Sequence, residues 1–167
     1  MLIVFAGLPG VGKSSIALQL AERLKAVYLR VDSIEQSIRE TDVLPEHGDV
    51  GPAGYIAAYR LAEDNLRLGL TVIADSVNPL QITRDVYRDV AWRAGARCFG
   101  IEVVCSDAAV HRRRVETRIS TVAGLKLPTW EQIESRGYET WDRPPFRLDT
   151  ALESVEQCVD SVIGAIQ

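Results

Sequence analysis

The sequence predicts an α/β fold with a mostly parallel sheet, because short apolar runs alternate with longer amphipathic stretches along the chain. The run at residues 70–75 is almost continuously apolar, as expected for a strand that is covered on both faces. No internal repeat or low-complexity tract interrupts this alternation. We therefore expect residues 1–167 to form a single domain, which is long enough to bury a real core.

Each element follows from its own local pattern. Strands are expected at residues 2–6, 26–31, 70–75, 97–105 and 146–149. Helices are expected at residues 13–25, 32–40, 78–95, 106–120 and 151–166, with a further helix through Tyr55, Tyr59, Ala62 and Leu66. The helix at 78–95 begins with Asn-Pro and ends with Gly, so Asn78 is its expected N-cap. The stretch 41–52 is an expected loop, and 121–145 has no clear pattern.

Composition excludes several classes of protein. The formal net charge is -4 and the sequence pI is near 5.2, so a nucleic-acid partner is not expected. The three cysteines are far apart and form no C-x-x-C pair, which argues against a disulfide framework or a zinc site. The apolar opening is too short to span a membrane and has no basic leader, so we expect a cytoplasmic protein.

The strongest motif is Gly7-x-x-x-x-Gly12-Lys13-Ser14, which lies between an expected strand and an expected helix. Its glycines let backbone N–H groups approach phosphate oxygens, and the helix N-terminus adds a favourable dipole. This pattern predicts binding of ATP with Mg²⁺, where Lys13 bridges the β- and γ-phosphates and the Ser14 hydroxyl ligates the metal. The expected nucleotide contacts are Gly7, Leu8, Pro9, Gly10, Val11, Gly12, Lys13, Ser14 and Ser15.

Carboxylates follow two of the expected strands. Asp32 comes after the second strand, where it can orient an acceptor hydroxyl and take its proton, although a capping box with Glu35 explains it as well. Asp75 ends the third strand, where it can hold Mg²⁺, and its alternative role is in the following turn. Ser76 lies on the same rim.

Arginines crowd the expected helix at 106–120. Arg114 and Arg118 are four residues apart, so both can point at one polyphosphate, and Arg118 is a candidate for stabilising charge on the transferred group. His111 stands alone and is expected to be structural or exposed.

Taken together, "GLPGVGKSS", "LRVDSIEQSI", "VIADSVNP", "RRRVETR" and "WDRPPFRLDT" resemble the P-loop small kinases, which include chloramphenicol phosphotransferase, gluconate kinase, adenylylsulfate kinase and the polynucleotide kinase domain. The resemblance implies a three-layer fold with a five-stranded parallel sheet in the order 2-3-1-4-5. It also implies transfer of the ATP γ-phosphoryl to a hydroxyl, with Asp32 as base. Arg114 would stack on adenine and Arg118 would contact phosphate.

The resemblance further implies a short lid at about 121–145, with Arg136 and Arg143 as weaker candidates to join the site when it closes. Trp130 and Trp141 would line the pocket or pack at the hinge. Several relatives carry Arg where this chain has Glu35, which counts against a phosphorylated or nucleic-acid acceptor. Candidates for the acceptor side are Glu35, Ser76, Arg136 and Arg143.

Three functions compete on this sequence. The leading one is an ATP-dependent phosphotransferase acting on a hydroxyl of a small-molecule acceptor. The second is a nucleotide-dependent ATPase switch that controls a partner through the loop at 41–52. The third is a 5'-hydroxyl polynucleotide kinase. The identity of the acceptor and the oligomeric state stay open.

Overall fold

The computed structural model describes residues 1–41 and 48–167. It contains five parallel strands in the order β2-β3-β1-β4-β5, which confirms the predicted sheet. The strands are β1 (Leu2–Ala6), β2 (Val27–Arg30), β3 (Val72–Asp75), β4 (Cys98–Val104) and β5 (Phe146–Asp149). The helices are α1 (Lys13–Leu24), α2 (Val31–Arg39), α3 (Ala53–Arg67), α4 (Gln81–Arg93), α5 (Ala108–Thr117), α6 (Trp130–Glu134) and α7 (Val155–Ile166).

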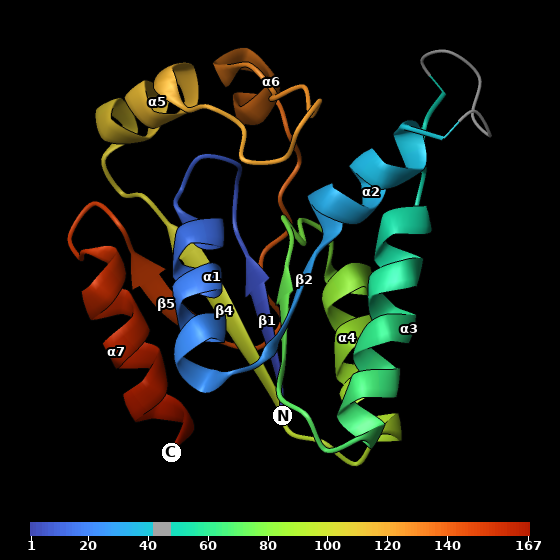
Figure 1. The fold of residues 1–167 in the computed structure, drawn as a ribbon. Helices are drawn as coiled ribbons and strands as arrows, with labels where there is room; N and C mark the ends of the chain where they lie inside the picture. Colours follow the sequence, from blue (N-terminus) through green and yellow to red (C-terminus); the bar gives the residue numbers. More distant parts are fainter. Residues whose placement is uncertain (42–47) are drawn as a thin grey trace.

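The central strand β1 is buried on both faces, because helices cover each side of the sheet. Ile3 and Phe5 pack into one core with α1 and α7, whereas Leu2 and Val4 pack into a second core with α3 and α4. This alternation is the period of two that a strand imposes on its side chains. Figure 1 shows the three layers that result.

The remaining helices lie at the carboxyl ends of the strands. Figure 1 shows α2 continuing upward from β2, and α5 and α6 above the sheet. Ligands of open α/β sheets bind at this edge, because loops there diverge from adjacent strands. The fold therefore places the glycine loop, Asp32 and the segment after α5 on one side of the molecule.

The predicted cap of α4 is wrong. Asn78 is fully buried with φ 43°, and its side-chain amide donates to the carbonyl of Phe5 at 2.7 Å. The helix begins three residues later at Gln81, whose backbone N–H donates to Glu139 Oε2 at 2.6 Å. The side chain of Asn78 therefore makes a tertiary hydrogen bond to β1 and does not cap the helix.

Two other local expectations are also corrected. The capping box at Asp32 does not form, because the N-cap of α2 is Arg30 and no side chain bonds there. The helix α5 ends at Thr117, and Arg118 has extended backbone angles, so Arg114 and Arg118 do not share one helical face. Asp107 caps α5 by accepting from the N–H groups of Ala109 and Val110.

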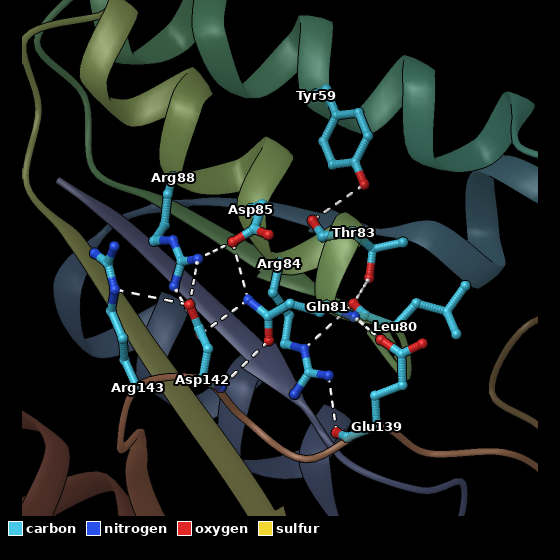
Figure 2. Close-up of polar contacts among 10 residues, drawn as sticks. All are labelled: Tyr59, Leu80, Gln81, Thr83, Arg84, Asp85, Arg88, Glu139, Asp142 and Arg143. Atoms are coloured by element: carbon cyan, nitrogen blue, oxygen red, sulfur yellow. Dashed lines mark hydrogen bonds and ion pairs between the residues drawn. The ribbon is translucent and has the colours of Figure 1, made fainter.

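The segment that follows α6 is fastened to α4. Buried Arg84 donates to the carbonyl of Glu139 at 2.8 Å, and its guanidinium carbon lies 4.7 Å from the ring centre of Trp141. Figure 2 shows the neighbouring contacts, in which Gln81 and Arg88 both reach Asp142. These contacts fix the chain just before β5.

Among the helices in the described part of the chain, none is long and apolar enough to cross a membrane. The three cysteines are free thiols, of which Cys158 is buried and Cys98 is exposed.

Candidate functional site: a phosphate-binding loop facing a basic cavity

The glycine loop requires its glycines at two positions. Gly7 has φ 133°, and a Cβ there would lie 2.2 Å from the carbonyl oxygen of Val103 in the neighbouring strand. Gly12 has φ 99° and caps the start of α1. Both backbone conformations are strained for residues with a side chain. They turn the loop back over the N-terminus of α1, where backbone N–H groups bind phosphate.

Residues far away in the sequence hold this loop. Thr150, just after β5, donates its hydroxyl to the carbonyl of Val11 at 2.8 Å and accepts from Arg114 Nη1 at 2.8 Å. His111 Nε2 lies 2.9 Å from the carbonyl oxygen of Pro9, and its ring forms a T-shaped pair with the ring of Trp130. His111 is buried, so of the two predicted alternatives, structural or exposed, the exposed one is wrong. The loop is thus supported from β5 and from α5.

Lys13 is buried at the head of α1. The residue is 7% exposed, and its ammonium donates to the carbonyl of Leu8 at 2.9 Å. Burial lowers the pKa of Lys13 to about 8, although the negative charges of Asp75 and Asp32 oppose that shift. An ammonium held in such a place gains from a bound phosphate, because the phosphate supplies the missing counter-charge.

The loop forms one wall of a cavity of about 1090 Å³. Most of the sequence-predicted site residues line this cavity: Pro9, Gly10, Gly12, Lys13, Ser14, Ser15, Asp32, Glu35, Arg114, Arg118 and Arg136. Gly7, Leu8 and Val11 do not line it, and Leu8 and Val11 pack into the core instead. A site of this volume accommodates a nucleotide together with a second small molecule.

Asp32 and Arg118 lie within electrostatic range of each other in the cavity. Partial burial lowers the pKa of Arg118, and the negative charge of Asp32 opposes that shift. Asp32 is in the first turn of α2, and Arg118 follows α5. The site therefore brings a carboxylate and a guanidinium from different elements toward Lys13.

Asp75 is not among the residues that line the cavity. It is buried, and its Oδ2 accepts from the phenolic hydroxyl of Tyr28 at 2.7 Å. Its negative charge opposes the lowering of the Lys13 pKa and adds to the burial that raises the pKa of Tyr28, so Asp75 is close to the loop. Ser76 is also buried and does not line the cavity, so the structure does not bring it to the acceptor side.

Two predicted arginines are placed differently from expectation. Arg114 lines the cavity, but its guanidinium is engaged by the Thr150 hydroxyl and by the Thr150 carbonyl at 3.0 Å. Arg143 lies outside the cavity, where it is 75% exposed and pairs with Asp142. Trp130 and Trp141 do not line the cavity either, in agreement with the packing alternative.

Sequence reasoning missed several residues of the site. The cavity is also lined by Arg30, Gln36, Arg39, Lys126, Gln132 and Thr150. The sequence could have indicated Arg30 as a site residue, because it ends β2 two residues before Asp32. Thr150 follows directly after β5, at the same edge of the sheet. The others lie on α2 or in the segment after α5, where no motif marks them.

Fold and site together define a P-loop nucleotide-binding protein. The model of the family described as "AAA domain" matches residues 2–135, so the chain belongs to this family. No curated protein matches the sequence.

Solved structures of similar fold include kinases. A proposed kinase from Chloroflexus aurantiacus J-10-fl has a TM-score of 0.78 and 20% identity, over 99% of this chain and 98% of that one. The APS kinase CysC of Mycobacterium tuberculosis, in complex with AMPPNP and APS, has a TM-score of 0.70 and 21% identity, over 99% and 96%. Kti12 of Chaetomium thermophilum, in complex with ADP-AlF3, has a TM-score of 0.72 and 25% identity, over 100% of each chain.

Proposed function

We propose that this protein is an ATP-dependent phosphotransferase that moves the γ-phosphoryl of ATP to a hydroxyl of a small-molecule acceptor. The observation that carries the proposal is the placement of Asp32 and of Lys13 in the walls of one cavity. A phosphate cradle alone serves many reactions, but a carboxylate facing it suits a reaction in which a hydroxyl loses its proton. The kinase folds among the similar structures support the same class.

The reaction assigns a role to each group. The acceptor oxygen forms a bond to the γ-phosphorus, the bond to the bridging oxygen of the β-phosphate breaks, and ADP leaves. Asp32 orients the hydroxyl and accepts its proton, which then passes to solvent. Lys13 and Arg118 stabilise charge on the transferred group, and the N–H groups of the loop hold the β-phosphate.

Mg²⁺ belongs to this proposal, and the residues present fit it. Ser14 offers a hydroxyl at the cavity wall, and buried Asp75 has one carboxylate oxygen bonded to Tyr28 and the other left for the metal or its water. The described residues contain no group of three or more carboxylate, imidazole or thiolate ligands that would form a metal site alone. Mg²⁺ bound with a nucleotide does not need one, because phosphate oxygens supply the remaining ligands. When bound, the ion would neutralise charge on the β- and γ-phosphates.

The acceptor is proposed to bind between α2 and the segment after α5. Glu35 and Arg136 line the cavity from these elements, so they are the remaining candidates from the sequence. The net charge of -4 continues to favour a small molecule over nucleic acid. A cytoplasmic location, with its supply of ATP, is part of the same proposal.

The test is release of ADP from Mg-ATP across a panel of hydroxyl compounds that includes sugars, nucleosides, antibiotics and an oligonucleotide with a free 5'-hydroxyl. Asp32→Asn should lose acceptor-stimulated release by at least about a hundredfold while it still binds ATP. Asp64→Asn, at an exposed position on α3, is the matched control and should behave as the wild type. Undiminished turnover in Asp32→Asn would show that Asp32 does not accept the proton of the acceptor hydroxyl.

A nucleotide-dependent switch is the second candidate. The likeness to Kti12 in complex with ADP-AlF3, which extends over the whole of both chains, favours it. Half of the expected partner-sensing loop at 41–52, residues 42–47, lies outside the described residues. Slow ADP release that ignores every acceptor, together with nucleotide-dependent association with another protein, would support this candidate over the phosphotransferase.

A further inference from the structure

The cavity is strongly basic although the protein is acidic. In the described part of its lining, three carboxylates face seven cationic side chains: Lys13, Arg30, Arg39, Arg114, Arg118, Lys126 and Arg136. The formal net charge of the whole chain is -4. Concentrating positive charge in one cavity attracts anionic ligands and costs stability until they bind. The lining therefore indicates that its ligands carry more than one anionic group.

Six of these seven cations fall into two sets that come from different elements, and Arg39 is paired with Glu35 on α2. Lys13 and Arg118 lie beside the phosphate-binding loop, and Arg114 is tied to Thr150 at the same end. Arg30 is at the start of α2, and Lys126 and Arg136 come from the segment between α5 and β5. A nucleotide held by the loop places its phosphates against the first set. The second set is then open to another molecule, although the charge of Arg30 also reaches Lys13 and helps to lower its pKa.

Arg30 is the member of the second set whose own contacts point to a missing anion. Its Nη1 donates to Thr121 Oγ1 at 2.7 Å, which holds the guanidinium toward the segment after α5. Its Nε is buried and has no hydrogen-bond partner among the described residues. No carboxylate within the described ranges forms an ion pair with it. A half-buried guanidinium with a free donor is costly by itself and suits a carboxylate, phosphate or sulfate group.

Glu35 does not balance Arg30. The Glu35 carboxylate lies 3.4 Å from Arg39 Nη2 on the same helix, and its side chain packs against Gly54. In the sequence, Glu35 counted against a phosphorylated acceptor. In the structure, its negative charge is already paired with Arg39. Arg30, at the end of β2, is left to bind an anion.

From these contacts we infer that the cavity, which Lys126 and Arg136 also line, contains a second anion subsite at Arg30, and that the acceptor carries a phosphate, sulfate or carboxylate group besides its hydroxyl. Only the statement that the bound molecule is the acceptor rests on the proposed function, and the anion subsite itself does not. Arg30 and Asp32 are two residues apart at the junction of β2 and α2. One molecule can therefore place its oxyanion on Arg30 and its hydroxyl at Asp32.

Titration of inorganic sulfate into protein saturated with Mg²⁺ and a non-hydrolysable ATP analogue tests the subsite, because the phosphate-binding loop is then filled. Calorimetry should detect one sulfate site, and Arg30→Gln should weaken it by at least about tenfold. Arg30→Lys keeps the positive charge but loses the planar guanidinium with its paired N–H donors, and should retain part of the affinity for sulfate. Arg113→Gln, an exposed change on α5 with the same loss of charge, should bind sulfate as the wild type does.

The subsite and the proposed function fail separately. Equal sulfate binding by wild type and a folded Arg30→Gln, or no binding by the wild type, would overturn the subsite. Transfer to neutral acceptors that sulfate does not inhibit would also overturn it and leave the phosphotransferase in place. Sulfate binding that requires Arg30, without transfer to any hydroxyl, would support the subsite and count against the phosphotransferase.

Discussion

The hydroxyl of Thr150 lies 2.8 Å from the carbonyl oxygen of Val11, so a residue after the last strand holds the middle of the phosphate-binding loop. Arg114 donates to the same hydroxyl and to the Thr150 carbonyl. The shape of the loop therefore depends on the position of the edge strand β5, which Thr150 follows, as well as on the glycines of the loop.

Thr150→Val should weaken the binding of Mg-ATP by about tenfold, because it leaves the Val11 carbonyl and the Arg114 guanidinium without their shared partner. Thr150→Ser keeps the hydroxyl and should bind nearly as tightly as the wild type. Calorimetric titration of both variants checks this. Equal affinities for Thr150→Val and wild type would show that the bond does not position the loop.

Gly7→Ala should lower the free energy of unfolding by about 3 kcal/mol, since the new Cβ would meet the Val103 carbonyl oxygen at 2.2 Å in a backbone conformation with positive φ. Gly137→Ala is the matched control, because nothing lies within 4 Å of its Cβ position. Urea unfolding of the two variants measures the difference. A loss under about 0.5 kcal/mol for Gly7→Ala would contradict the described loop geometry.

Lys13 should make the stability of the ligand-free protein depend on pH. Its pKa is about 8 in the folded chain against 10.5 for the unperturbed group, so the unfolded chain binds the proton more tightly. As pH falls from 10.5 to 8, stability decreases by about 3 kcal/mol, and below pH 8 this cost stays constant.

Lys13→Met should therefore stabilise the ligand-free protein at pH 7 by about 2 kcal/mol, since loss of the bond to Leu8 offsets part of the gain. The advantage should shrink toward pH 10.5. Thermal melting across this range measures it. A Lys13→Met protein that is less stable at pH 7 than the wild type would contradict the assigned burial cost.

Arg84→Met should lower the free energy of unfolding by about 3 kcal/mol, because it removes a buried donor from the carbonyl groups of Leu80 and Glu139. Arg60→Met, at an exposed position on α3, is the control. Urea unfolding compares the two. Similar small losses for both variants would show that Arg84 does not fasten the segment before β5.

Local patterns predict much of the fold and of the loop. Strand periodicity and the Gly7 to Ser14 spacing depend on neighbouring residues, so the five strands and the loop between β1 and α1 can be found from sequence. Asp32 can be found for a similar reason, because the carboxyl end of a parallel strand is a known place for ligands.

The residues that sequence reasoning misses or misplaces depend on the arrangement of the strands. Thr150 meets Val11 only because β4 and β5 pair beside β1, and nothing in the local sequence of Thr150 indicates that contact. Asn78 has the sequence of a helix cap, yet a tertiary bond to Phe5 decides its conformation. Arg143 lies in the expected lid, but it is 75% exposed and is not among the residues that line the cavity.

The most direct test of the central claim is to follow the label from ATP carrying a labelled γ-phosphate, in the presence of the hydroxyl acceptors that stimulate ADP release. We predict that the label appears covalently on an acceptor with the wild type and is lost from that product with Asp32→Asn. Label that appears only as inorganic phosphate, at the same rate in both proteins, would contradict the phosphotransferase.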